Sequence, residues 1–361
     1  MATTFKTLLN NDITSTRTLL HEAIPITGTI VSGTYVETST STSNIKNYGH
    51  GMFQSVYDYP YLSSSANHIF DITVGYASDS ALSKSDGSQA ADQSKKINLY
   101  NQMAQLLVGH DVNGDIRKFD QDGDLTGGTK MREVIFINFA RLLSKDELKK
   151  GSLSLQFLTG GRPAGTGLIE DVISGPQEGL KTIADYNAQN EFRINSPAGE
   201  YGILYTSSAT PSSTSGVGHI YYQAGIAVLT ASIFDGEFGQ AGAAYITSSV
   251  ETVLSGANIT ASCDGLRNRW YNVQYNNTTE LNSTIYFCRA NHNDFNYSTN
   301  PTYLENSKIR IKNNTFDMPV SYITTVGLYS ADNELLAVAK LSEPLKKQPD
   351  TELTLRVRLD Y

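Results

Sequence analysis

The chain has 361 residues, a length that fits either two domains or one large β-rich domain. Hydrophobic residues make up 39% and charged residues 18%, so Ser, Thr, Asn and Gly carry much of the polar balance. This composition excludes a helical rod and favours strands joined by loops. The formal charge of −8 argues against a protein that wraps nucleic acid or lies on an anionic membrane, since both need a concentrated basic surface.

The two cysteines, Cys263 and Cys288, belong to no ligand group and do not make a disulfide framework. The first residues show no charged leader followed by an apolar core, so no signal peptide is predicted. No run approaches the length of apolar sequence that a membrane span needs. We therefore expect synthesis in a reducing cytoplasm and no membrane span.

Residues 1–50 are predicted to form an arm or extended segment, which includes an exposed Ser/Thr-rich stretch at 37–44. An α+β domain is predicted for residues 51–159. Its clearest helix lies within residues 89–108, where one apolar stripe repeats at spacings of three and four. The stripe consists of Ile97, Tyr100, Met103, Ala104 and Leu107.

Strands are predicted on either side of this helix. Residues 69–76 are strand-like, and residues 134–139 form a nearly continuous apolar run that is typical of a strand buried on both faces. A capping box from Ser144 to Glu147 predicts a short helix that ends at Gly151, before a further strand at 153–157.

Residues 160–215 are dominated by Gly, Ser, Pro and Asn, and we predict a loop-rich insertion or linker in which 201–205 is the one convincing strand. Residues 216–361 are predicted to form an antiparallel β domain. The predicted class is therefore α+β and β-rich, with mostly antiparallel sheet, a few short helices and long polar loops.

The strands predicted for that last domain follow one another in a meander. They comprise residues 219–222, 226–230, 270–275, 283–289, 322–329, 335–341 and 353–361. Asp332 and Asn333 form the turn of a hairpin, and the closing strand alternates apolar and polar residues. Arg356 and Arg358 lie on its polar face, so we select them as interface candidates.

Tyrosine is unusually frequent, with 21 Tyr against 13 Phe and one Trp. Tyrosine buries area while keeping a polar end, which suits surfaces that meet other proteins, but it also has a high propensity for the edges of sheets. Both interpretations stay open. Tyr329 and Tyr361, both in the closing region, join the two arginines as interface candidates.

Two acidic runs follow the predicted helix, at residues 111–115 and 120–124. Asp111, Asn113, Asp115 and Asp122 stand at positions from which a curled loop can hold Ca²⁺. The pattern lacks the glycine of the sharp turn, where Ile116 stands, and a closing glutamate. A solvated acidic loop is therefore the favoured interpretation, with calcium as the alternative and no other cofactor expected.

The remaining motifs predict no catalytic chemistry. The six histidines are scattered, no Gly-x-Ser-x-Gly is present, and the glycine-rich run at 160–167 has no Lys-Ser/Thr pair after it. A pair of facing carboxylates for polysaccharide cleavage cannot be read from sequence. We predict that the chain is not an enzyme.

Four segments carry a resemblance to a known class of protein. Residues 293–302, 322–329 and 334–344 resemble the closing region of virion structural proteins from contractile-tailed bacteriophages, including marine and cyanobacterial phages, and residues 218–230 are similar to a segment of the same proteins. The resemblance covers residues 216–361 well and residues 1–215 less distinctly. It brings no catalytic residues with it.

The resemblance implies a non-enzymatic structural subunit of the tail, with the baseplate as the favoured position, synthesised in the host cytoplasm and located in the virion. Its expected partners are other tail or baseplate proteins and copies of itself. The alternative is a receptor- or carbohydrate-binding tail module, in which Tyr-rich and Asp-rich loops contact a host glycan. Neither function requires nucleic-acid binding.

Overall fold

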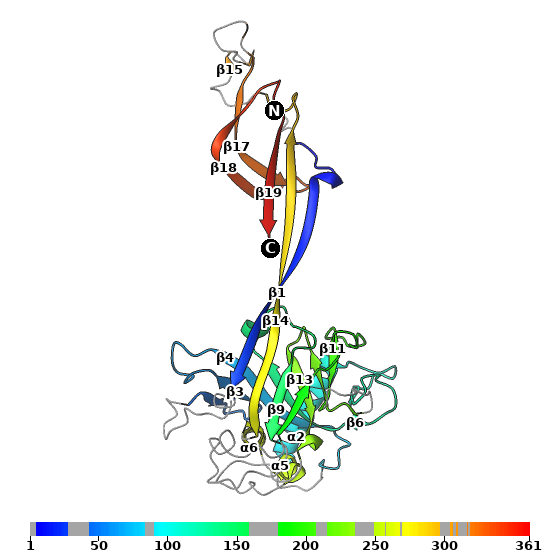
Figure 1. Cartoon of the computed structure of the whole chain (residues 1–361). Helices are drawn as coiled ribbons and strands as arrows, with labels where there is room; N and C mark the ends of the chain where they lie inside the picture. The colour runs from blue at the N-terminus through cyan, green and yellow to red at the C-terminus, as the bar shows by residue number, and fades with distance from the viewer. Residues whose placement is uncertain are drawn as a thin grey trace. The chain divides into compact units, whose positions relative to one another are not determined.

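The structure is a computed structural model of the whole chain, shown in Figure 1. It describes residues 5–27, 43–83, 90–158, 180–206, 215–234, 249–256, 258–267, 269–296, 304–305, 308–309, 316 and 318–361. Strands account for 45% and helices for 16%, and the strand pairs are antiparallel, so the predicted β-rich α+β class is confirmed. Most of the Ser/Thr stretch at 37–44, the glycine-rich run at 160–167 and residues 207–214 lie outside the described residues.

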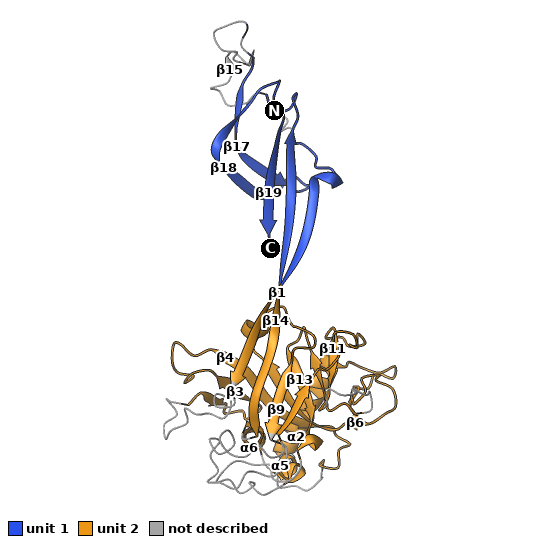
Figure 2. Ribbon diagram, in the orientation of Figure 1, with its two compact units in different colours: residues 1–19, 280–361 blue, residues 20–279 orange. Residues whose placement is uncertain are grey.

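The chain divides into two compact units (Figure 2). Unit 1 combines residues 1–19 with residues 280–361, and unit 2 consists of residues 20–279. The division falls inside two strands, β1 and β14, so each of them contributes residues to both units. The boundaries expected from sequence, at residues 51, 160 and 216, all fall within unit 2.

Unit 2 is built on a seven-stranded sheet with the order β11-β12-β13-β7-β4-β3-β2. The strands are β2 (Ile45–Asn47), β3 (Gln54–Tyr57), β4 (His68–Tyr76), β7 (Glu133–Phe139), β11 (Tyr201–Leu204), β12 (Gly218–Tyr221) and β13 (Ile226–Thr230). The central strands β4 and β7 are buried over most of their length, which confirms the prediction from the apolar run at 134–139. Strands β2, β3 and β4 form one meander and strands β11, β12 and β13 form another. Strand β7 lies between the two meanders, paired with β4 and with β13.

The predicted helix is α2 (Ala90–Leu107), which lies against β4. Tyr100, Ala104 and Leu107 of the apolar stripe are buried, and they share a core cluster with aromatic residues of the sheet. Gly75 of β4 permits the close approach, because a Cβ atom there would lie 2.8 Å from the backbone oxygen of Lys96. The helix prediction is confirmed, including its apolar face.

A six-stranded sheet packs against the first through Trp270. The indole ring stacks on Phe70 of β4, with ring centroids 4.9 Å apart, and also contacts Phe157, 4.8 Å away. The order is β1-β14-β9-β10, and β8 and β19 also pair with β14. The strands are β1 (Ile13–Thr27), β8 (Glu147–Leu148), β9 (Ser154–Leu158), β10 (Leu180–Ala184), β14 (Trp270–Ala290) and β19 (Leu353–Asp360).

Short helices and ladders complete the described structure. These are η1 (Asn10–Asp12), α3 (Arg141–Ser144), η3 (Ala231–Ile233), α5 (Val250–Gly256), α6 (Ile259–Arg267), and the paired strands β5 (Phe119–Asp120) with β6 (Lys130–Met131), β15 (Leu304–Glu305) with β16 (Lys308–Ile309), and β17 (Ser321–Tyr329) with β18 (Leu335–Lys347). Among the described helices, none is both long enough and apolar enough to cross a membrane.

Three local features differ from the predictions. The capping box at Ser144 does not start a helix, because α3 ends there, Lys145 adopts a φ of +55° and Glu147 begins strand β8. The strands expected at 270–275 and 283–289 are parts of the single strand β14. Strand β10 was not predicted, and it pairs with β9 along its whole length.

Candidate functional site

An acidic group lies in the loop between β5 and β6. Asp120, Asp122 and Asp124 each direct a carboxylate oxygen to within 4.8 Å of the others. The short ladder brings the two ends of the loop together, because Phe119 pairs with Met131 and Asp120 with Lys130. Of the four residues named for the alternative of a calcium loop, only Asp122 belongs to this group.

Asp120 is fully buried, and its counter-charge comes from across the ladder. The ammonium of Lys130 lies 2.7 Å from Oδ2 of Asp120, while neither carboxylate oxygen receives a hydrogen bond of good geometry. Burial raises the pKa of Asp120, and the Lys130 ammonium opposes that rise. At Gly128, a Cβ atom would lie 3.1 Å from Oδ1, so the loop backbone closes over the carboxylate.

The first acidic run has a different role. Oδ1 of Asp111 accepts the backbone N–H groups of Asn113 and Asp115, at 2.8 and 2.9 Å. The carboxylate therefore stabilises its own turn, which is a common use of Asp in loops. Among the described residues, the acidic residues brought together are those of the second run.

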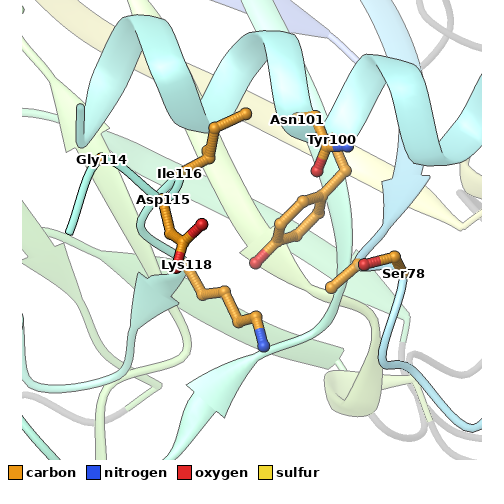
Figure 3. A pocket seen from close by; sticks show the side chains of 8 residues that line it. Ser78, Tyr100, Asn101, Gly114, Asp115, Ile116 and Lys118 are labelled. Carbon is orange, nitrogen blue, oxygen red and sulfur yellow. The ribbon is translucent and has the colours of Figure 1, made fainter. Parts of the chain in front are cut away.

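A polar cavity of about 330 Å³ adjoins that turn (Figure 3). It is lined by Ala77, Ser78, Tyr100, Asn101, Gly114, Asp115, Ile116 and Lys118. Its main polar groups are already engaged, since the Tyr100 hydroxyl donates to the carbonyl oxygen of Met131 and Lys118 pairs with Asp79. The lining residues supply no nucleophile with an adjacent base, so the cavity offers no reaction that can be named.

The acidic group yields a prediction about calcium. We expect millimolar Ca²⁺ to leave the melting temperature of the wild-type chain unchanged, because Lys130 already neutralises Asp120. In Lys130→Met the three carboxylates keep no ammonium, so Ca²⁺ should stabilise the variant, by roughly 2.7 kcal/mol at about 100 times the Kd. Differential scanning calorimetry with and without chelator measures both.

The matched control is Lys118→Met, which removes an ammonium from the exposed carboxylate of Asp79. Its melting temperature should not respond to Ca²⁺. A calcium-dependent rise in the wild-type chain would instead support the calcium loop, which the sequence offers as the alternative to a solvated acidic loop.

Among the described residues of unit 2, seven tyrosines are buried, and all but Tyr205 belong to its two hydrophobic core clusters. They are Tyr76, Tyr100, Tyr201, Tyr205, Tyr221, Tyr222 and Tyr275. Tyr222, for example, donates its hydroxyl proton to the buried carboxylate of Asp185 at 2.9 Å. Packing inside the sheets therefore explains these seven residues, and the interface argument is left to exposed ones such as Tyr322, Tyr329 and Tyr361.

The predicted interface residues all lie in unit 1, on two strands and at the chain end. Tyr329, at the end of β17, is 46% exposed. Arg356 and Arg358 are exposed on β19, where Arg358 pairs with Asp360 at 2.7 Å. Tyr361 is 74% exposed, with its hydroxyl 3.0 Å from that of Thr284. The alternation predicted for the closing strand is confirmed, with Val357 buried.

Tyr329 belongs to an exposed apolar surface that the sequence did not reveal. Its ring contacts that of Phe5, with centroids 4.9 Å apart, and lies over Gly327, where a Cβ atom would be 2.9 Å from the ring. A register shift in the β17–β18 ladder sets Leu335 opposite Tyr329, with Leu336 unpaired beside it. We call the set the hairpin patch: Phe5, Tyr329, Leu335, Leu336 and Val338, each 44–67% exposed.

The acidic group lies within unit 2, and the hairpin patch lies within unit 1. Comparisons of the chain with protein-family models, with curated proteins and with solved structures found no match.

Proposed function

We propose that this chain is a non-enzymatic structural subunit of a contractile bacteriophage tail, positioned in the baseplate, and that unit 1 is the part through which it packs against its neighbours. The resemblance of residues 293–302, 322–329 and 334–344 suggests the tail. The construction of unit 1 supports the packing role independently of that resemblance.

The observation that carries the proposal is that the described residues of unit 1 form no hydrophobic core of their own. Both hydrophobic core clusters consist of residues from unit 2. In the described part of unit 1, the buried apolar residues are Ala290 and Val357. Burial of apolar surface is the main favourable term in folding, and a unit that buries so little must obtain it elsewhere.

Polar contacts do not replace that core. The ammonium of Lys347 donates to the carbonyl oxygens of His292 and Gln348 and to Oδ1 of Asn296, at 2.8–3.2 Å. Ion pairs also join Lys6 to Asp294 and Asp12 to Arg289. Pairs at or near the surface contribute at most about 1 kcal/mol each, which is small against the entropy of ordering a chain segment.

The hairpin of β17 and β18 depends most on a neighbour. It forms a two-stranded sheet by itself, and such hairpins are at best marginally stable in water. Its residues are half-buried or exposed except at Ser321 and Lys347. A subunit of a large assembly gains this burial when it is built into the particle.

Hydrogen exchange on the free chain and on purified tails tests the proposal. Amides of β17 and β18 should exchange at least about tenfold more slowly in the tail, because the assembly covers them. Strands β4 and β7 provide the internal control, since their burial within unit 2 protects them in both states. Equal exchange of the hairpin in both states, or absence of the chain from purified tails, would contradict the proposal.

A further inference from the structure

We propose that the neighbour covering unit 1 is unit 1 of a second copy of this chain, so that the protein assembles with itself before its incorporation. This inference rests on the packing role proposed for unit 1 and names the partner. Three properties of unit 1 favour a copy over an unrelated protein.

The first property is charge. Unit 1 contains 11 Lys and Arg and 11 Asp and Glu, so its formal charge is zero. Unit 2 contains 17 basic and 25 acidic residues and therefore carries the whole charge of −8. Contacts between two copies of unit 1 meet no net repulsion, whereas contacts between two copies of unit 2 do.

The second property is a sheet with two open edges. Within unit 1, β14 pairs with β19 from Ser283 to Ala290, and β1 runs along the other edge of β14 (Figure 1). On that edge Ser15 lies opposite Thr284, and Asp12 forms an ion pair with Arg289. Among the described strands, β1 and β19 pair only with β14, so each leaves a row of backbone groups unpaired.

A second copy presents both of these edges. The β19 edge of one copy can therefore meet the β1 edge of the next, and the same contact repeats around a closed ring. Residues of β1 from Ile13 to Ala23 are all exposed, and long exposed edge strands are normally blunted or covered. An unrelated partner would have to bring two matching edges of its own.

The third property is the hairpin patch. Leu336 and Val338 are 67% and 57% exposed. Leu336 follows Leu335, which pairs with Tyr329, and Val338 pairs with Gly327, over which the Tyr329 ring lies. Apolar surface of this kind, flanked along the chain by the exposed Glu334 and Lys340, is typical of a contact between proteins. In the ring, the patch of each copy packs against the neutral unit 1 of the next.

The test is the mass of the full-length chain in solution, measured by sedimentation equilibrium from about 1 to 100 μM, together with two single variants of the patch. We expect the wild-type chain to form a discrete oligomer. Val338→Lys and Leu336→Glu each place a charge in the contact and should weaken association on the order of 100-fold. Both side chains are exposed in the single chain, so its fold is retained, and fluorescence of Trp270 verifies unit 2.

The control is Val112→Lys, which places the same charge at a valine of unit 2 that is 96% exposed. It should leave the oligomer unchanged. An oligomer that survives both patch variants, or dissociates equally in the control, would overturn the inference. If the wild-type chain is monomeric but its hairpin is protected in purified tails, the partner is a different protein; this result overturns the inference and leaves the proposed function standing. If the hairpin is not protected in purified tails, the proposed function is contradicted as well.

Discussion

Replacing Trp270 with alanine should lower the free energy of unfolding of unit 2 by about 4 kcal/mol, the largest loss expected from any single side chain of the core. The indole is fully buried and lies between Phe70 and Phe157, so it joins the two sheets. Alanine leaves a cavity that these rings, held by their own strands, can fill only in part. Because Trp270 is the single tryptophan, denaturant unfolding is followed by far-UV circular dichroism.

Two substitutions provide the comparison. Trp270→Phe keeps an aromatic ring in the gap and should cost less than half as much. Tyr59→Ala removes an aromatic ring that is 48% exposed and should change stability by less than about 1 kcal/mol. A loss below about 1 kcal/mol in Trp270→Ala would mean that the sheets are not held together at this position.

Local patterns were sufficient for the elements whose burial follows from their own residues. The apolar stripe of α2 and the continuous run of β7 predicted both the elements and the faces that they bury. In each case neighbours within one or two turns, or within one strand, decide the conformation, so no distant partner is needed to recognise it.

The continuity of β14, which the sequence did not reveal, depends on contacts with residues that are distant along the chain. Residues 276–282, mostly Asn, Thr and Glu, have a low strand propensity and separate the strands predicted at 270–275 and 283–289, yet β14 passes through them. Asn277 is buried there, accepting the N–H of Glu22 and donating to the carbonyl oxygen of Leu143. These partners are more than 100 residues away, and they satisfy the polar side chain within the strand.

The same limit applies to the candidate sites. The two acidic runs have similar spacing, and only the β5–β6 ladder reveals that the second run gathers its carboxylates and faces Lys130. The alternation of the closing strand points to Arg356 and Arg358, and the frequency of tyrosine points to Tyr329. The absence of a core beneath them became visible only when burial was known for the described part of unit 1.

Removing the carboxylate of Asp185 should destabilise unit 2 almost as strongly as removing Trp270. Asp185 is 1% exposed and accepts the N–H groups of Gly151 and Leu153, at 2.6 and 3.0 Å, and the hydroxyl of Tyr222 at 2.9 Å. It thereby ties the turn before β9 to the end of β12, in the other sheet. Asp185→Ala leaves three donors without an acceptor, of which the N–H of Leu153 and the hydroxyl of Tyr222 are buried, for a loss of about 3–4 kcal/mol.

Asp185→Asn separates the hydrogen bonds from the charge. Its amide oxygen can still accept from Gly151 and Tyr222, while its NH₂ group faces the N–H of Leu153, so a cost of about 1–2 kcal/mol is expected. Asparagine does not titrate, and it therefore serves as the reference for the pH dependence of the wild-type carboxylate. Fluorescence of Trp270 follows unfolding in both proteins.

Burial raises the pKa of Asp185 to about 6, against 3.8 for the free side chain, although the three hydrogen bonds oppose the rise. The folded state then binds more protons than the unfolded state between these values, so the contribution of Asp185 to stability is largest below about pH 4 and is lost as the pH rises through 6. Two pKa units correspond to roughly 3 kcal/mol.

When the wild-type chain is measured by itself, the titration of His219 masks the pH dependence that comes from Asp185. Burial lowers its pKa to about 4, so its contribution is present above pH 6.5 and lost as the pH falls, the opposite direction over nearly the same window. The difference between wild type and Asp185→Asn cancels the histidine. That difference should fall by roughly 3 kcal/mol between pH 4 and pH 6.5; a difference independent of pH would mean that Asp185 is ionised throughout this range in the folded state.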